Sequence, residues 1–220
     1  MTSLVLLFDL DGTLTDPGPG IVRCMRYALD KVGARRPSDD ALASYIGPSL
    51  RGTFATLLQT SDAVLIEQAV TFYRELYGET GLFENHVYDG IVPLLDQVRL
   101  TASASYVATL KPTRYAERIV RHFGLDPYFS GVYGSEMEGK YGSDKTELLA
   151  HLFASERIAA EHAVMIGDRA GDILAARAHR VRSIGALWGY GSEAELAGAG
   201  ADSLCASPKE LVACLSRLTT

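Results

Sequence analysis

Residues 4–14 read Leu-Val-Leu-Leu-Phe-Asp-Leu-Asp-Gly-Thr-Leu, a short apolar run followed by two closely spaced acids. The run from Leu4 to Phe8 is continuous rather than alternating, as expected for a strand buried on both faces of a parallel sheet. Asp9 and Asp11 follow it directly, so they would stand at the carboxyl end of that strand. This stretch predicts an α/β sheet whose polar edge begins at Asp9.

Similar apolar runs recur along the chain and alternate with helical patterns. We expect further strands at residues 105–109, 131–133, 163–166 and 183–187, and a short one ending at 204–205. Helical periodicity lies between them, at residues 91–100, 113–123, 145–153, 173–178, 193–197 and 209–218. This alternation predicts a Rossmann-like, doubly wound parallel sheet with right-handed crossovers.

One segment breaks the alternation. From Pro17 to about Leu82 only helical patterns appear, at residues 21–32, 41–46, 50–58 and 66–77. In the last of these, apolar residues recur at helical spacing and form one face, namely Ile66, Ala69, Val70, Tyr73 and Tyr77. We therefore expect a core made of residues 1–16 and 83–220, with an all-helical cap of residues 17–82 inserted between the first two strands.

Composition and charge exclude several classes of partner. The formal net charge of −6 argues against a nucleic-acid polymer, since proteins that bind one usually present a basic face. The three cysteines have no metal-like spacing and are expected to be buried thiols. The amino-terminal apolar run is too short for a signal peptide or a membrane span. We expect a cytoplasmic monomer or homodimer that acts on a small molecule and not at a membrane.

The turns that follow the predicted strands carry polar side chains. Thr109 ends the second strand, Lys145 opens the helix after the third, and Asp168 and Asp172 follow the fourth. Ligands of open α/β sheets bind beyond the carboxyl ends of the strands, where these turns meet Asp9 and its neighbours. The sequence therefore predicts one site at this edge.

These residue types suit phosphoryl transfer. A carboxylate such as Asp9 can attack phosphorus and form an acyl-phosphate, while Asp11 protonates the leaving oxygen and later takes a proton from water. Clustered carboxylates favour Mg²⁺, which prefers oxygen ligands. Lys145 and Thr109 would hold the phosphate oxygens. The predicted function is Mg²⁺-dependent hydrolysis of a small soluble phosphate ester.

Residues 8–14 resemble the first motif of the haloacid dehalogenase superfamily, and the other three turns are similar to its remaining motifs in order. The resemblance covers the whole chain and includes that superfamily's small helical cap. It is closest to the phosphoglycolate phosphatase-like branch. Within that branch, Gly134-Ser135-Glu136, Ser143-Asp144-Lys145 and Trp188-Gly189-Tyr190-Gly191 are similar to 5′-nucleotidase-like members.

The resemblance implies a role for each site residue. It makes Asp9 the nucleophile and Asp11 the acid and base, and it gives phosphate contacts to Thr109 and Lys145. The implied metal set is Asp9, Asp11 through its main-chain carbonyl, Asp168, and Asp172 in a second shell or through water.

Two positions depart from the branch. Leu110 stands where a polar Ser or Asn is usual, which removes one side-chain contact near the phosphate. Lys145 is followed by Thr146 instead of the proline common in phosphoglycolate phosphatases. The second departure counts against phosphoglycolate specifically. The Ser-Asp-Lys form of the third motif, with the segments at 134–136 and 189–191, favours a nucleoside 5′-monophosphate. Trp188 or Tyr190 could then face a base, whereas a glycolate carboxylate would need a cation such as Arg51.

Other functions of the same fold remain as alternatives. A haloacid dehalogenase has no leaving group to protonate and usually lacks the second acid, so Asp11 counts against it. A phosphomutase or another phosphotransferase also keeps both acids. It differs from a phosphatase in that no free phosphate appears in solution. A binding module without catalysis would be expected to have lost Asp9 or Asp168.

Overall fold

The computed structural model describes residues 4–136 and 144–219, and every structural statement below concerns these residues. Ser143, part of the third predicted motif, lies outside them. The chain divides into two compact units. Unit 1 comprises Met1–Thr15 and Val87–Thr220, and unit 2 comprises Asp16–His86.

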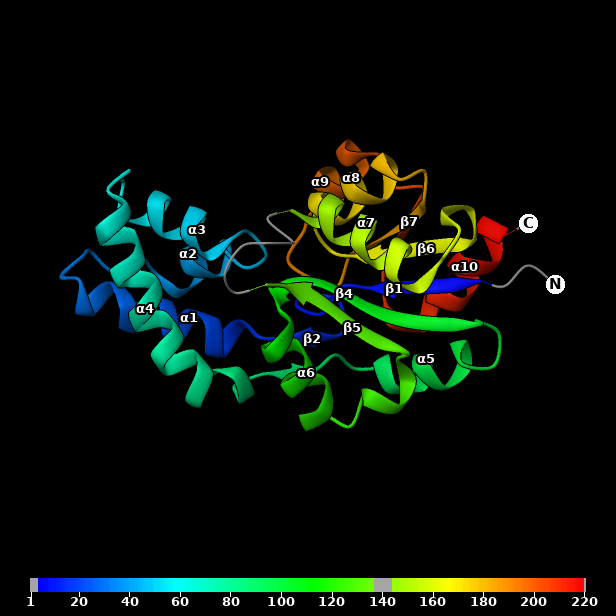
Figure 1. The fold of residues 1–220 in the computed structure, drawn as a ribbon, viewed down its shortest axis with the longest axis horizontal. Coiled ribbons are helices and arrows are strands. Elements are labelled where there is room, and N and C mark those ends of the chain that lie inside the picture. The colour runs from blue at the N-terminus through cyan, green and yellow to red at the C-terminus, as the bar shows by residue number, and fades with distance from the viewer. Residues whose placement is uncertain (1–3, 137–143, 220) are drawn as a thin grey trace. The chain divides into compact units, whose positions relative to one another are not determined.

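Unit 1 is built on a six-stranded sheet in the order β5-β4-β1-β6-β7-β8, in which every pair is parallel (Figure 1). The strands are β1 (Val5–Phe8), β4 (Ala104–Pro112), β5 (Gly131–Ser135), β6 (Ala163–Gly167), β7 (Arg182–Ala186) and β8 (Ser203–Cys205). All four residues of β1 are buried, as the continuous apolar run predicts. The predicted parallel α/β fold is confirmed.

Helices cover both faces of this sheet. Figure 1 shows α7, α8 and α9 on one face and α5 and α6 on the other, and α10 contacts α5. Their bounds are α5 (Ile91–Val98), α6 (Thr113–His122), α7 (Lys145–Glu156), α8 (Ala170–Ala178), α9 (Glu193–Ala199) and α10 (Leu211–Thr219). Short 3₁₀ turns are η2 (Asp126–Tyr128), η3 (Ala160–His162) and η4 (Pro208–Glu210). The connections from β1 and from its neighbour β6 thus leave toward opposite faces, which makes the β1/β6 boundary a topological switch point.

Two elements of unit 1 begin or end at residues other than those predicted, and both differences lie near the predicted site. Strand β4 runs on to Pro112 because its pairing with β5 shifts register between Ala108 and Pro112 and then resumes. Helix α8 begins at Ala170 instead of residue 173, because its first backbone N–H groups find side-chain acceptors. The Ala170 N–H donates to Glu195 Oε1 at 2.8 Å, and the Arg169 N–H donates to Asp172 Oδ2 at 3.0 Å.

Unit 2 is helical, with α1 (Gly18–Lys31), α2 (Asp39–Ala43), α3 (Leu50–Leu57), α4 (Ala63–Glu79) and the 3₁₀ turn η1 (Gly81–Phe83). The apolar face predicted for residues 66–77 is buried in part through Ala69, Val70, Tyr73 and Tyr77. Tyr73 stacks on Tyr77 and meets Phe54 of α3 edge to face. The short strands β2 (Thr15–Asp16) and β3 (His86–Val87) form a separate two-stranded sheet at the two chain crossings.

The helix predicted at residues 41–46 is shorter than expected. It ends at Ala43, and residues 45 and 46 form tighter turns to Leu42 and Ala43. The Ser44 hydroxyl donates to the Ala41 carbonyl, and Gly47 adopts a φ of 111° before Pro48. A proline disfavours helix in the residue before it, so the segment stops there.

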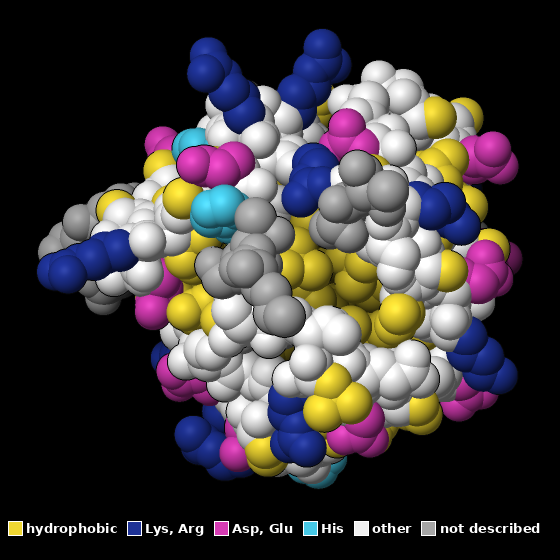
Figure 2. All heavy atoms as spheres, turned by 90° about the vertical axis from the view of Figure 1, so that its right-hand side faces the viewer, with side chains coloured by type: hydrophobic (Ala, Val, Ile, Leu, Met, Phe, Trp, Pro, Cys, Tyr) yellow, Lys and Arg dark blue, Asp and Glu magenta, His cyan; other side chains and the backbone are white. Residues whose placement is uncertain are grey.

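Bulk features of the described residues agree with the composition. All three cysteines are buried thiols, as predicted, and none of them forms a disulfide among the described residues. None of the described helices is both long enough and apolar enough to cross a membrane. On the face of the molecule shown in Figure 2, basic and acidic side chains are interspersed around a hydrophobic centre.

Candidate active site

The turn after β1 carries the two acids that open the predicted site. Strand pairing aligns Phe8 with Val107 of β4 and Ile166 of β6, so Asp9 emerges beside the ends of both neighbours. The Asp9 N–H donates to the Ile166 carbonyl at 2.9 Å and fixes this exit. The chain then turns through Gly12, which has a φ of +85°. A Cβ at Gly12 would overlap the Asp168 carboxylate, so glycine is needed both for the turn and for the close approach.

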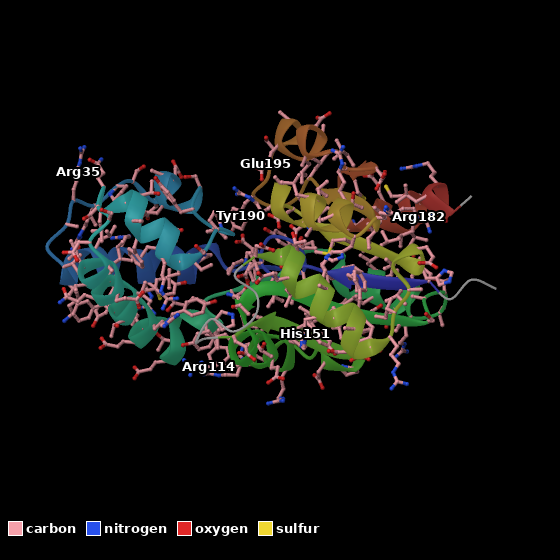
Figure 3. All side chains as sticks on the ribbon, turned by 45° about the horizontal axis from the view of Figure 1, so that its top comes forward. Arg35, Arg114, His151, Arg182, Tyr190 and Glu195 are labelled. Atoms are coloured by element: carbon pink, nitrogen blue, oxygen red, sulfur yellow. The ribbon has the colours of Figure 1, made fainter. Side chains whose placement is uncertain are left out.

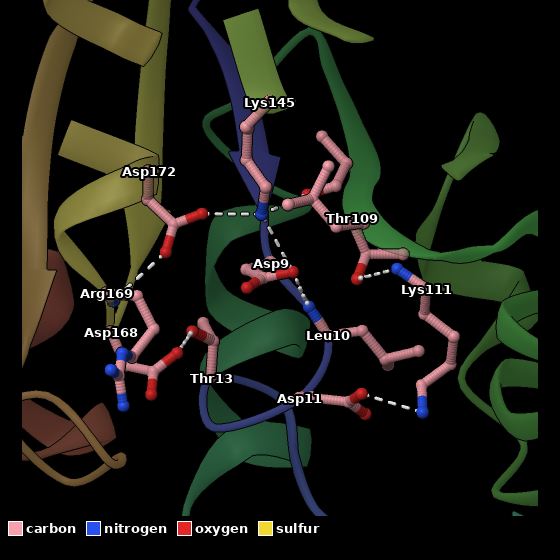
Figure 4. A network of polar contacts seen from close by, with 12 residues as sticks. Asp9, Leu10, Asp11, Thr13, Thr109, Lys111, Lys145, Asp168, Arg169 and Asp172 are labelled. Carbon is pink, nitrogen blue, oxygen red and sulfur yellow. Dashed lines mark hydrogen bonds and ion pairs between the residues drawn. The ribbon is translucent and has the colours of Figure 1, made fainter. Parts of the chain in front are cut away.

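Lys145 is the buried cation at the centre of the site (Figure 4). It is the first residue of α7, which is capped by the Asp144 side chain accepting from the Glu147 N–H. The Lys145 ammonium lies 2.9 Å from Asp9 Oδ1 and 2.5 Å from Asp172 Oδ1, and it donates to the Ala108 carbonyl at 3.0 Å. Burial alone would lower the pKa of Lys145, but the charges of Asp172 and Asp9 raise it, so the group stays protonated.

Asp168 and Asp172 come from the β6–α8 turn and differ in their surroundings. Asp168 is fully buried and accepts hydrogen bonds from the Thr13 hydroxyl at 3.3 Å and the Tyr190 N–H at 2.8 Å. Asp172 has one carboxylate oxygen against Lys145 and the other on the Arg169 N–H. Both oxygens of Asp172 therefore already have protein partners.

The remaining predicted residues stand on the β4 side of Asp9 (Figure 4). Thr109 is buried, and its hydroxyl accepts from the Lys111 N–H at 3.3 Å. Asp11 forms an ion pair with Lys111, whose ammonium lies 2.7 Å from Asp11 Oδ2. The structure thus gathers all six predicted site residues at the carboxyl edge of one sheet.

The electrostatic balance of this cluster is negative. Four carboxylates, those of Asp9, Asp11, Asp168 and Asp172, are accompanied by the ammonium groups of Lys111 and Lys145. The nearby Arg169 is paired with Glu195 at 3.1 Å and adds no net charge. A fully ionised cluster of four acids and two bases carries a net charge of −2.

This imbalance appears in the pKa values. Burial, together with the charges of Asp9 and Asp172, raises the pKa of Asp168 to about 8. Burial also raises the pKa of Asp172, and it raises that of Asp11, where Lys111 partly offsets it. Ionising all four carboxylates together is therefore energetically unfavourable unless another positive charge is bound.

A divalent cation fits this donor set. Asp9, Asp168 and Asp172 each offer a carboxylate oxygen, and these oxygens all lie within 4.8 Å of one another. Buried oxygen ligands that together need two positive charges match the preferences of Mg²⁺. The Asp11 carboxylate is not part of this group.

The sequence patterns indicate no role for Lys111, and they suggest Trp188 and Tyr190 only as aromatic side chains that could face a nucleotide base. The Trp188 indole N–H donates to the Thr13 carbonyl at 2.9 Å, and the Tyr190 backbone N–H holds Asp168. The segment after β7, where Figure 3 labels Tyr190, therefore braces the β1 turn and Asp168. The feature of the sequence that could have indicated a role for Lys111 is its position, because it is a basic residue two positions after Thr109.

Arg51, the predicted partner for a substrate carboxylate, already has an acidic partner in unit 2. Its guanidinium forms a two-point ion pair with Glu67 of α4, including a 3.1 Å bond from Nη2 to Oε2. A guanidinium held in this way has fewer donors left for a small anion.

Comparisons with known proteins agree with this geometry. The family model described as haloacid dehalogenase-like hydrolase matches residues 6–186. A protein named 5′-nucleotidase from Pseudomonas aeruginosa is 46% identical over 87% of this chain and 86% of its own length. Proteins named phosphoglycolate phosphatase include one from Colwellia psychrerythraea, 29% identical over 84% of this chain and 85% of its own.

Two further proteins broaden the comparison. The tyrosine-protein kinase PtkA of Mycobacterium tuberculosis is 39% identical over 85% of this chain, which spans only 63% of PtkA. The crystal structure of a predicted phosphatase from Clostridium acetobutylicum superposes with a TM-score of 0.93 at 35% identity, covering 99% of this chain and 100% of that one. From the family match, these relatives and the shared architecture, we conclude that the chain belongs to the haloacid dehalogenase-like hydrolases and is one of their phosphatases.

Proposed function

We propose that this chain is a Mg²⁺-dependent phosphomonoesterase that hydrolyses a small soluble ester through an aspartyl-phosphate on Asp9. One observation carries the proposal. The Asp9 side chain is only 11% exposed and its carboxylate lies against the Lys145 ammonium, with a second acid, Asp11, two residues away in the same turn. A nucleophile, a buried cation and a proton carrier thus occupy one sheet edge, and each is needed for a two-step displacement at phosphorus.

The chain's own residues divide the chemistry between them. Asp9 attacks phosphorus, and Asp11 donates a proton to the departing oxygen and then receives one from the attacking water. Lys145 and Thr109 contact the equatorial oxygens of the phosphoryl group, where negative charge is concentrated. Lys145 also pairs with Asp9 and Asp172 in the resting site.

The metal set that we propose is Asp9, Asp168 and the main-chain carbonyl of Asp11. Asp172, whose oxygens are bound by Lys145 and the Arg169 N–H, belongs to the second shell or reaches the ion through water. Bound Mg²⁺ would supply positive charge to the phosphate oxygens and neutralise the excess of carboxylates.

A nucleoside 5′-monophosphate is the substrate class that we favour. The relative named 5′-nucleotidase is 46% identical to this chain, whereas the phosphoglycolate phosphatase is 29% identical. The Arg51 guanidinium, the cation predicted for a glycolate carboxylate, is paired with Glu67 within unit 2. Tyr190 is half-buried beside Asp168 and is the aromatic side chain we nominate for contact with a base.

A panel of phosphate esters tests the activity and the substrate class together. We expect release of inorganic phosphate, with kcat/KM for 5′-UMP or 5′-AMP at least tenfold above that for 2-phosphoglycolate, or about 1.4 kcal/mol of discrimination. The opposite preference would contradict the nucleotide assignment and make Arg51→Ala the next variant to test. Consumption of ester without matching free phosphate would instead indicate a phosphotransferase.

Metal binding should depend on pH because Asp168 must lose its proton to act as a ligand. With a pKa of about 8 in the metal-free protein, Asp168 is mostly protonated at pH 7. We expect Mg²⁺ binding to release about one proton at pH 7 and progressively less above pH 8, while the apparent affinity rises toward pH 8 and then levels off. Calorimetric titration in two buffers of different ionisation enthalpy measures this release. Binding with no proton release at pH 7 would contradict the proposed role of Asp168.

A further inference from the structure

The two oxygens of the Asp11 carboxylate have different surroundings. Oδ2 lies 2.7 Å from the Lys111 ammonium, and the two side chains are only 14% and 6% exposed, respectively (Figure 4). Oδ1 is buried and has no hydrogen-bond partner among the described residues. The carboxylate is therefore held through one oxygen while the other is left free. A buried oxygen without a partner is costly, so it is expected to meet a ligand.

Lys111 reaches Asp11 because strand β4 is irregular at this point. The pairing of β4 with β5 shifts register between Ala108 and Pro112, and such bulges re-aim side chains near active sites. Within this irregular stretch, the Lys111 N–H donates to the Thr109 hydroxyl at 3.3 Å. The bulge thus turns the chain at Lys111 and places its side chain beside Asp11.

Two residues of β5 hold the bulge in place. The Ser135 hydroxyl donates to the Leu110 carbonyl at 2.7 Å. Gly134 lies so close to the Lys111 carbonyl and the Thr113 backbone that a Cβ would overlap both. Gly134 and Ser135, whose pattern was noted in the sequence, thus support the segment that carries Lys111.

We propose that Lys111 is a positioning residue that fixes Asp11 through Oδ2 and so assigns proton transfer to Oδ1. This inference rests on the proposed aspartyl-phosphate mechanism. In the first step, an Asp9 oxygen bonds to phosphorus as the ester P–O bond breaks, and the proton on Asp11 Oδ1 passes to the departing oxygen. In the second, water bonds to phosphorus as the bond from Asp9 breaks, and Asp11 Oδ1 takes the water proton. Lys111 keeps its own protons throughout.

The test compares esters whose leaving groups differ in their need for a proton. The alkoxide of 5′-UMP needs one, whereas the phenolate of 4-nitrophenyl phosphate leaves without it. The parameter is kcat/KM, which ends at transfer to Asp9 and so excludes later hydrolysis. We expect Asp11→Asn to lose about 10²–10⁴-fold with 5′-UMP and far less with the aryl ester. Lys111→Met should show the same selectivity, with a loss in kcat/KM for 5′-UMP at least tenfold larger than its loss for 4-nitrophenyl phosphate.

Three further variants separate positioning from other roles. Lys111→Arg retains a cation that can pair with Asp11 and should recover most of the 5′-UMP activity. In the Asp11→Asn background, Lys111→Met should lower kcat/KM for 5′-UMP by a further factor of less than about three, because the effects of residues that act as one unit are not additive. Lys209→Met, which changes an exposed lysine of unit 1, should leave kcat/KM unchanged for both esters.

Ser135→Ala keeps the test decisive if Lys111→Met fails to fold. It removes only the hydroxyl bond to Leu110, and it should give a smaller loss that is again selective for 5′-UMP. Equal losses for both esters in Lys111→Met would overturn positioning and indicate a phosphate contact instead. Losses that multiply in the double variant would also overturn it. Equal losses in Asp11→Asn itself would show that the proposed acid role of Asp11 fails, and the role of Lys111 with it.

Discussion

Asp9→Asn is expected to fold normally and to lose at least about 10⁴-fold in kcat/KM with every ester, including activated aryl phosphates. The reason is that a neutral amide is a poor nucleophile toward phosphorus, and a better leaving group does not repair that defect. The substitution also removes a negative charge beside Lys145, which retains Asp172 and the Ala108 carbonyl as partners. The fold should therefore survive the change.

Steady-state kinetics with 5′-UMP and 4-nitrophenyl phosphate measure this loss, and thermal unfolding measures the fold. Asp126→Asn is a matched control, because it makes the same chemical change at an exposed position in η2. Protein mass spectrometry must show that the introduced asparagine has not deamidated back to aspartate. Activity within tenfold of wild type in intact Asp9→Asn would rule out Asp9 as the nucleophile.

Removal of metal should abolish activity, and added Mg²⁺ should restore it. With Asp168 protonated, the metal-free cluster still has three other carboxylates beside the two ammonium groups of Lys111 and Lys145, so a phosphate dianion would be repelled from it. Ca²⁺ should not substitute, since its larger and more irregular coordination shell would misplace the phosphate. Asp168→Asn should weaken Mg²⁺ binding as well as turnover.

Activity after chelation and after addition of each cation tests this expectation, and calorimetry of Mg²⁺ binding provides a readout that does not depend on turnover. Arg169 and Glu195 offer a control, because Glu195→Gln alters a neighbouring ion pair without removing a proposed ligand. Undiminished turnover in rigorously metal-free buffer would contradict the account.

Much of the fold follows from local sequence patterns. The continuous run ending at Phe8 predicts a strand buried on both faces, and β1 is buried along its whole length. Because β1 pairs in register with β4 and β6, the order of the motifs along the chain places Asp9, Thr109 and Asp168 at one edge. The meeting of these residues could therefore be predicted before any coordinates.

The parts that were not predicted depend on tertiary contacts. Lys111 pairs with Asp11 from the stretch of β4 where the register shifts, and strand periodicity does not reveal where such a shift falls. Trp188 reads as an aromatic surface, but its indole N–H is bound to the Thr13 carbonyl. Arg51 reads as a free cation, yet Glu67 of another helix is its partner.

Leu110 has a backbone role that its side chain does not reveal. The motif resemblance predicts that the leucine side chain removes one polar contact near the phosphate. Its carbonyl, however, accepts the Ser135 hydroxyl and helps to hold the bulge that carries Lys111. The backbone role is independent of the side chain, so the sequence alone could not indicate it.

The central claim is the covalent intermediate on Asp9, and rapid-quench analysis with 4-nitrophenyl [³²P]phosphate and Mg²⁺ tests it most directly. This ester needs no proton to release its leaving group, so the intermediate should form quickly, while its breakdown still needs Asp11. We expect acid-quenched protein to carry label at early times, and borohydride reduction followed by peptide mass spectrometry to find homoserine at position 9. Phosphate release without protein-bound label above that of Asp9→Asn, or label on another residue, would contradict the account.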